Sequence, residues 1–142
     1  MYQDILVPTD GSETTGVVLE HAIDIAQGRD ATVHALYVVD DQALLTLSAD
    51  MTEEVLDGLQ EEGQQAVSEA TDRLSAAGLD STAAIVRGKP SEEIIAYASE
   101  ESVDLITMGT HGDETTNMLG STSQRVVTDA PVPVLTVKVS EE

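Results

Sequence analysis

Four small residues near the carboxyl end of the chain have the types and spacing that bind phosphate. Gly109 and Gly112 follow an apolar run, and Gly120 and Ser121 begin a predicted helix. Glycines let backbone N–H groups approach an anion closely, and the first turn of a helix adds a favourable dipole. The segment lacks the lysine of a Walker loop and is not the Gly-x-Gly-x-x-Gly pattern of dinucleotide-binding proteins. It therefore predicts a phosphate cradle of another kind.

Other residues that could do chemistry are few. His21, His34 and His111 have no metal-ligand spacing to one another, which favours core, surface or loop positions for them and predicts no metal site. Acidic pairs such as Glu53-Glu54 are typical of solvated faces, because such pairs abound in this composition. The chain contains no cysteine, which excludes disulfides, thiol catalysis and thiolate metal sites.

The net charge of the chain is strongly negative. It carries 27 acidic residues against six basic ones, a formal charge of −21. A nucleic acid or an anionic membrane surface is therefore an unfavourable partner, since phosphate binding needs Lys and Arg. The acids are spread along a chain with regular apolar periodicity, which argues against a disordered acidic chain. We interpret the charge as that of a halophilic protein from a high-salt cytoplasm, where a Debye length of about 3 Å at ~1 M salt screens self-repulsion.

Length and composition predict a single folded domain over residues 1–142. With 41% hydrophobic residues the chain can bury a core, and no apolar run approaches the ~20 residues of a membrane span. The first residues lead directly into a predicted strand, without the basic and apolar regions of a secretory signal, so we expect a cytoplasmic protein.

Apolar periodicity predicts five strands that alternate with four helices. The predicted strands are Asp4–Pro8, Thr32–Val39, Thr82–Val86, Asp104–Met108 and Val134–Val139. The expected helical core positions are Val18, Ala22, Ile25 and Ala26 before Gly28; Val55, Leu59, Ala66, Ala70, Leu74 and Ala77 from about Thr52 to Gly78; Ile94, Ile95 and Ala98 after Pro90; and Val126 and Val127 within Ser121–Asp129. Gly63 is expected to weaken the second of these helices, and Asp40–Asp50 is predicted as a loop.

This alternation predicts an open parallel sheet with helices on both faces, a Rossmann-like α/β fold. On topology alone, the strand orders 2-1-3-4-5 and 3-2-1-4-5 both remain open. In the second order the first and fourth strands are neighbours at the switch point, where ligands bind beyond the carboxyl ends of the strands. The loops there would be Pro8–Ser12 and Gly109–Ser121, the two segments richest in Gly, Asp and Ser.

Several motifs together resemble the universal stress protein family over essentially the whole chain. They are Ile-Leu-Val-Pro-Thr-Asp-Gly-Ser at residues 5–12, Tyr-Val-Val-Asp at 37–40, Asp-Leu-Ile-Thr-Met-Gly-Thr-His-Gly at 104–112 with Gly120-Ser121, and Ala-Pro-Val-Pro-Val-Leu at 130–135. The resemblance implies a five-stranded parallel sheet of order 3-2-1-4-5. Its ATP-binding branch implies a bound adenine nucleotide, ATP or AMP, with Mg²⁺ as a counter-ion for the phosphates.

The resemblance also assigns roles to residues of this chain. Pro8 and Thr9 would shape the pocket floor, Asp10 would hold the ribose or phosphate side, and the Val38 backbone would contact adenine. Asp10 could equally cap the first helix. The remaining implied binding residues would cradle ribose and phosphates: Gly109, Gly112, Gly120, Ser121 and Thr122.

The glycine loop departs from the family pattern in length and charge. The nucleotide-binding pattern has nine residues between the second glycine and the Gly-Ser pair, whereas Asp113–Leu119 supplies seven. A basic residue often follows the second glycine in the family, but Asp113 and Glu114 stand here. Two carboxylates would repel a triphosphate unless salt or Mg²⁺ offset them, so loss of ATP binding remains an alternative.

Three hypotheses about function follow. The first is an adenine-nucleotide-binding stress-response regulator that acts on a protein partner through its nucleotide state or its dimeric state. The second is a stress-response dimer that has lost nucleotide binding, and the third and weakest is a slow ATP-hydrolysing enzyme, for which Asp10 is the only candidate base. The final predicted strand, Val134–Val139, has an open edge and apolar side chains, which together with the resemblance predicts a homodimer through it.

Overall fold

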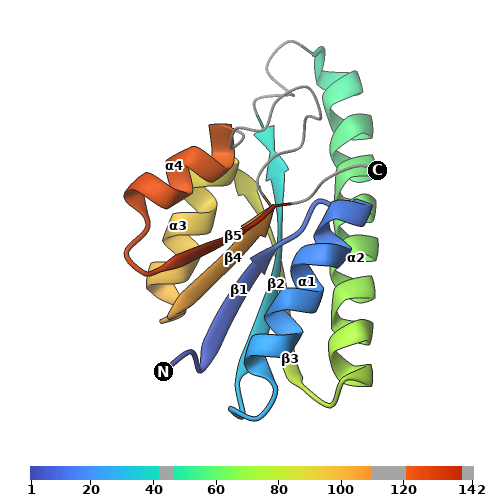
Figure 1. Cartoon of the computed structure of the whole chain (residues 1–142). Coiled ribbons are helices and arrows are strands. Elements are labelled where there is room, and N and C mark those ends of the chain that lie inside the picture. Colours follow the sequence, from blue (N-terminus) through green and yellow to red (C-terminus); the bar gives the residue numbers. More distant parts are fainter. Residues whose placement is uncertain (42–46, 110–120, 139–142) are drawn as a thin grey trace.

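The protein alternates strands and helices along the whole chain (Figure 1). The computed structural model describes residues 1–41, 47–109 and 121–138. The elements are β1 (Asp4–Pro8), α1 (Glu13–Ala26), β2 (Thr32–Asp40), α2 (Ala49–Ala76), β3 (Asp80–Gly88), α3 (Pro90–Glu100), β4 (Leu105–Gly109), α4 (Ser121–Asp129) and β5 (Val134–Val137). Every pairing between described strands is parallel, and the order is β3-β2-β1-β4-β5. The order 3-2-1-4-5 and the Rossmann-like class are confirmed.

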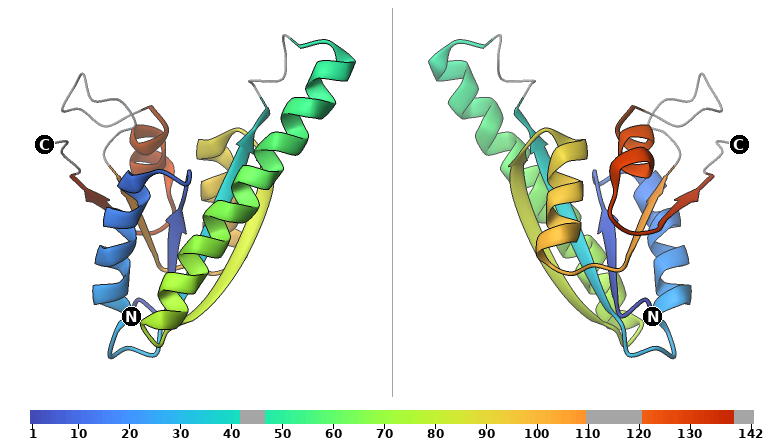
Figure 2. Two further views of the ribbon diagram at one scale, coloured as in Figure 1. Left: turned by 90° about the vertical axis from the view of Figure 1, so that its right-hand side faces the viewer. Right: turned by 90° about the vertical axis from the view of Figure 1, so that its left-hand side faces the viewer.

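Helices cover both faces of the sheet. The helices α1 and α2 lie on one face, and α3 and α4 lie on the other (Figures 1 and 2). Successive side chains of β1 point to opposite faces, as the period of a strand requires. Ile5 and Val7 are buried with α1 and α2, while Leu6 is buried with Ile94 of α3 and Val126 of α4. The two cores therefore hold α1 and α2 against one face of the sheet and α3 and α4 against the other.

One predicted core position of α4 is wrong. Val126 is fully buried, as expected, but Val127 is 44% exposed. Consecutive residues of a helix are turned by about 100° from each other, so a short helix on a sheet buries only one of two neighbouring valines. The predicted strand ends differ by a few residues, since β3 runs from Asp80 to Gly88 and β4 includes Gly109.

The longest helix, α2, reaches beyond the sheet. It begins at Ala49, inside the segment predicted as a loop, and the backbone N–H of Met51 donates to the hydroxyl of Ser48 at 3.4 Å. At 1.5 Å per residue its 28 residues span about 42 Å, longer than β3, and its first turns project past the sheet (Figures 1 and 2). Val55, predicted in the core, is therefore 37% exposed.

Gly63 of α2 has a packing role that the sequence does not reveal. A Cβ at this position would lie 2.6 Å from Cδ1 of Tyr37 on β2, closer than two non-bonded carbon atoms approach each other. The absent side chain lets the Tyr37 ring lie against the helix, where Tyr37 is only 7% exposed. The glycine that lowers helix propensity therefore permits close helix–sheet contact.

β5 forms one edge of the sheet and pairs only with β4 among the described strands. Its described part ends at Val137, and residue 139, the last of the predicted strand, lies outside the described residues. Val137 is 6% exposed and belongs to the core beneath α1, whereas Leu135 is 36% exposed. Leu135 is therefore the most exposed side chain in the described part of this strand, while Val134 and Thr136 are half-buried.

Candidate functional site

A cleft of about 480 Å³ opens at the carboxyl ends of β1 and β4. This is the switch point of the sheet, because β1 is followed by β2 on one side while β4 lies on the other. The lining comes from five separated parts of the chain: the end of β1 with the first half of α1, the second half of β2, the start of α3, the end of β4, and the start of α4. The residues are Pro8, Thr9, Asp10, Thr14, Thr15, Val18, Leu36, Val38, Pro90, Ile94, Gly109, Ser121, Thr122 and Ser123.

Seven of the nine predicted site residues line this one cleft. They are Pro8, Thr9, Asp10, Val38, Gly109, Ser121 and Thr122. The other two, Gly112 and Gly120, lie outside the described residues, as do His111 and the acids Asp113 and Glu114. Apart from Val38, sequence reasoning missed the apolar lining, which includes Leu36 and Ile94. Their pattern marks them only as core positions, and no sequence signal shows that they also reach the cleft.

Asp10 stabilises the turn that leads into α1. Its Oδ1 accepts hydrogen bonds of 2.9 Å from the backbone N–H of Ser12 and from the hydroxyl of Thr15. Burial alone would raise the pKa of Asp10, but these hydrogen bonds outweigh it and hold the pKa below its usual value. Ser12 occupies the N-cap position but makes no side-chain cap bond. Asp10 thus stabilises the turn before α1 and lines the cleft, but in the described contacts it accepts from no backbone N–H of the helix itself, so it is not a helix cap.

Thr9 ties the same turn to the neighbouring strand. Its backbone N–H donates to the carbonyl of Leu36 at 2.8 Å, and its hydroxyl accepts from the N–H of Gly11 at 3.1 Å. Gly11 has a φ of +81°, in the left-handed region that glycine enters without a steric cost. The turn between β1 and α1 is therefore held in one shape, and its polar groups have fixed positions at the cleft.

The start of α4 is anchored on the end of β4. The hydroxyl of Ser123, which is 6% exposed, donates to the carbonyl of Gly109 at 2.9 Å. This bond fixes the first turn of α4 against the strand, so that Ser121 and Thr122 face the cleft. The unsatisfied N–H groups and dipole of a helix N-terminus favour an anion there. Ser123 was not predicted as a site residue, and its role becomes visible only in the structure.

The cleft combines an apolar side with a polar side. Leu36, Val38 and Ile94 supply aliphatic surface, which suits a flat aromatic base. Asp10, Ser121 and Thr122 supply the hydrogen-bonding groups. Within the described ranges no cluster of three His, Asp or Glu side chains could hold a metal ion, and no described helix is long and apolar enough to span a membrane.

A second polar cluster lies at the opposite end of the sheet. Nε2 of His34 lies 3.0 Å from Oδ1 of Asp4, and Nδ1 lies 2.8 Å from the Tyr97 hydroxyl and 3.1 Å from the Thr82 hydroxyl. Because a carboxylate only accepts hydrogen bonds, Nε2 carries the ring proton and donates to Asp4. The other ring nitrogen, Nδ1, can then accept a hydrogen bond from a hydroxyl. Burial raises the pKa of the Tyr97 hydroxyl, which stays protonated. We call Asp4, His34, Thr82 and Tyr97 the amino-end cluster.

The fold and the cleft define a doubly wound parallel α/β domain with a ligand-sized site at its switch point. The sequence matches the universal stress protein family over residues 1–138. Universal stress protein MJ0531 of Methanocaldococcus jannaschii is 38% identical over 141 residues, which cover 97% of this chain and 83% of that protein. The chain belongs to the universal stress protein family.

Solved structures agree with this assignment. The structure of protein MJ0577, also of Methanocaldococcus jannaschii, superposes with a TM-score of 0.91 at 33% identity, and the match covers 100% of this chain and 99% of that one. A universal stress protein in complex with cAMP superposes at 0.70 with 24% identity, covering 96% and 97% of the two chains. An Arabidopsis thaliana member with AMP bound superposes at 0.72 with 18% identity, covering 96% and 91%. The last two likenesses show the shared fold.

Proposed function

We propose that this protein binds an adenine nucleotide in the cleft between the β1–α1 turn and the start of α4, and that the bound nucleotide regulates a stress-response interaction. The observation that carries the proposal is that separated segments, predicted from the sequence to hold a nucleotide, line one cleft of about 480 Å³. Small-molecule sites fall in the range of about 300–1,000 Å³, with an apolar lining and a few polar groups.

The lining offers each part of a nucleotide a suitable neighbour. The aliphatic side chains of Val38, Leu36 and Ile94 would pack against adenine, and the Asp10 carboxylate would accept from ribose hydroxyls. The N–H groups at the start of α4 would receive phosphate oxygens. AMP and cAMP are the ligands of two proteins with this fold, which supports the adenine nucleotide class. Mg²⁺ would accompany a triphosphate as a counter-ion.

Binding, rather than turnover, is the activity that these residues favour. Among the described residues that line the cleft, Asp10 is the only carboxylate. Its lowered pKa makes it a weak base, and its Oδ1 already accepts two hydrogen bonds. We therefore propose at most slow ATP hydrolysis.

The decisive test compares two identical substitutions at different places. Val38→Trp would fill the cleft, whereas Val55→Trp adds the same ring to an exposed position on α2. Calorimetry in molar KCl should show that the wild type and Val55→Trp bind adenosine, AMP or ATP, and that Val38→Trp does not. Absence of binding by the wild type at millimolar ligand would overturn the proposal and favour the dimer that has lost nucleotide binding.

We also propose a homodimer through the open edge of β5. Leu135 is the exposed apolar residue of this strand, and a two-fold axis would pair the strand with its counterpart as an isologous contact. Leu135→Lys should shift sedimentation in molar KCl from dimer to monomer. Val137→Lys is unsuitable because Val137 is a core residue, and its loss would unfold the edge of the sheet. A dimer that survives Leu135→Lys would contradict this interface.

A further inference from the structure

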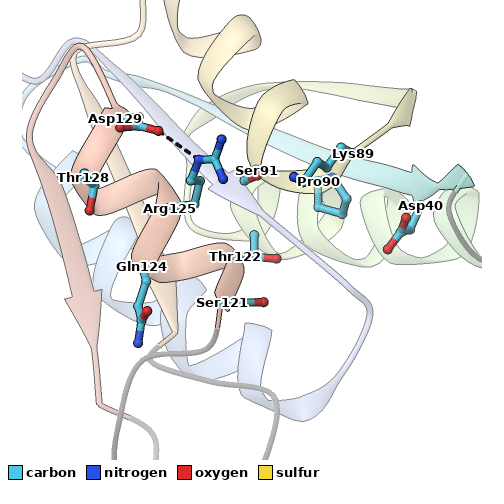
Figure 3. Close-up of a pocket in the computed structure, with 10 residues that line it drawn as sticks. All are labelled: Asp40, Lys89, Pro90, Ser91, Ser121, Thr122, Gln124, Arg125, Thr128 and Asp129. Atoms are coloured by element: carbon cyan, nitrogen blue, oxygen red, sulfur yellow. Dashed lines mark hydrogen bonds and ion pairs between the residues drawn. The ribbon is translucent and has the colours of Figure 1, made fainter.

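A second pocket, of about 690 Å³, lies beside the cleft, between the first turns of α3 and α4 (Figure 3). Lys89, Pro90 and Ser91 contribute from the start of α3, and Ser121, Thr122 and Arg125 contribute from α4. Two helix N-termini therefore face the same space, and each carries unsatisfied N–H groups and a positive dipole end.

The hydroxyl of Ser91 indicates that this pocket binds a ligand. Ser91 is only 4% exposed and lines the pocket, yet in the described part of the chain no group hydrogen-bonds with its hydroxyl. Buried hydroxyls are almost always paired in folded proteins, and an exception in a cavity calls for an explanation. The corresponding buried serine of α4, Ser123, does have a partner, the carbonyl of Gly109 at 2.9 Å. The Ser91 hydroxyl is thus available to a bound oxygen.

The charges in the pocket differ from those of the rest of the molecule. Lys89 and Arg125 are two of only six basic residues in a chain with a net charge of −21. Arg125 bonds to Asp129 through Nε at 3.0 Å, which leaves its two terminal NH₂ groups for another acceptor (Figure 3). Within the described ranges the Lys89 ammonium has no ion-pair partner.

Two carboxylates limit how strongly this pocket attracts an anion. Asp129 already pairs with Arg125, and Asp40 lies at the end of β2, in register with Gly88 and next to Lys89. The formal side-chain charges therefore cancel, and the two helix N-termini leave a surplus of hydrogen-bond donors. A ligand that is a compact acceptor, such as a phosphate group, suits this balance better than a cation or an apolar group does.

The pocket and the cleft share part of their lining. Pro90, Ser121 and Thr122 line both spaces, so the pocket directly adjoins the cleft. We propose that Lys89, Ser91 and Arg125 form a phosphate subsite that receives the terminal phosphate of a nucleotide whose adenosine part occupies the cleft. This inference rests on the proposed function. It gives the phosphates a basic alternative to a glycine loop that carries Asp113 and Glu114.

The test measures adenosine, AMP, ATP and inorganic phosphate by calorimetry at one molar KCl concentration. Lys89→Met and Arg125→Gln should each weaken ATP binding by about tenfold, and Ser91→Ala by about threefold, while adenosine binding stays unchanged. The matched controls are Lys138→Met and Arg29→Gln. Each removes one positive charge at a position outside the pocket, and neither should change the affinity for ATP or for adenosine. Lys89→Arg should retain ATP binding, and Asp40→Asn should strengthen it.

The outcomes separate this inference from the proposed function. Equal affinity of the wild type and both charge variants for ATP, with adenosine still bound, would overturn the subsite and leave the nucleotide cleft standing. Absence of adenosine binding would overturn the cleft. In that case, binding of inorganic phosphate by the wild type but not by the variants would support a free-phosphate site in this pocket, and absence of phosphate binding would overturn it as well.

Discussion

Polar residues gather at both ends of this sheet, but they are organised differently. At the amino end, the side chains of Asp4, Thr82 and Tyr97 all hydrogen-bond with the ring of His34. At the carboxyl end, the cleft and the neighbouring pocket are open, and the donors of Lys89 and Ser91 have no partner among the described residues. Groups that satisfy one another hold the strands together, whereas groups left open with fixed positions are suited to bind a ligand.

The largest single-residue effect should come from breaking the closed end. His34→Leu would leave Asp4 and two hydroxyls without their shared partner, and we expect a loss of about 3 kcal/mol in the free energy of unfolding. Nucleotide affinity should not change, since the cluster lies at the other end of the sheet. Denaturant titration of this variant checks the value, with His21→Leu on the exposed face of α1 as the control. A loss below about 1 kcal/mol would show that the cluster does not stabilise the sheet as we argue.

Salt should stabilise the whole domain, without favouring the amino end or the carboxyl end of the sheet. The net charge of −21 repels itself, and screening in molar KCl should raise the free energy of unfolding by about 2 kcal/mol or more, or roughly 6–10 °C in melting temperature. Thermal melts from 0.1 M to 3 M KCl measure the shift. The His34→Leu variant should shift in parallel with the wild type, because the substitution leaves the 27 acidic residues that dominate the net charge in place. Melting temperatures that do not move with salt would contradict the halophilic interpretation.

Two buried serines allow the comparison to be made within the carboxyl end itself. Ser123→Ala removes a hydrogen bond to Gly109 and should cost about 1 kcal/mol of stability. Ser91→Ala removes a hydroxyl that has no partner in the described structure, and it should change stability by less than about 0.3 kcal/mol. Paired denaturant titrations of the unliganded protein measure both. Equal losses in the two variants would mean that Ser91 has a structural role and is not available to a ligand.

The smallest expected effect is on acid stability. Because the pKa of Asp10 is lowered in the folded state, its carboxylate stabilises the fold fully above its ordinary pKa of 3.8, and this contribution is lost as the pH falls from there through the lower pKa of the folded protein. The Asp10 side chain is surrounded by protein on one side but is exposed to solvent on the other, which screens its interactions, so Asp10→Asn should cost only about 0.5 kcal/mol at neutral pH. The difference between variant and wild type should vanish once the pH is below the lowered pKa of the folded state. Unfolding measured against pH checks this, and a difference that persists in acid would point to lost packing.

Much of this molecule is predictable because strong local patterns repeat along it. The apolar strands, the glycine after α1 and the proline at the start of α3 predict the order of the elements. The motif residues in the first, second and fourth strands and at the start of α4 predict where the cleft lies. Burial of a particular helical residue is harder to predict, as Val127 shows, because it depends on the angle at which a helix meets the sheet.

Contacts between distant segments could not be predicted. Ser91 of α3 and Arg125 of α4 line the same pocket, and nothing in the sequence around either residue indicates this. The same holds for His34, whose partners come from β1, β3 and α3. Gly63 was interpreted by propensity alone, although its neighbour Tyr37 decides its role.

The overhang of α2 has a consequence for the dynamics of the native state. Residues such as Ala66, Ala70 and Leu74 pack on the sheet, whereas the turns around Met51 and Val55 project beyond it and bury little apolar surface. Isolated helical turns are marginally stable in water, so the first turns can unwind while the rest of the helix stays folded. Amide hydrogens along this one helix should therefore exchange with solvent over a wide range of rates, fastest near Met51 and slowest near Leu74.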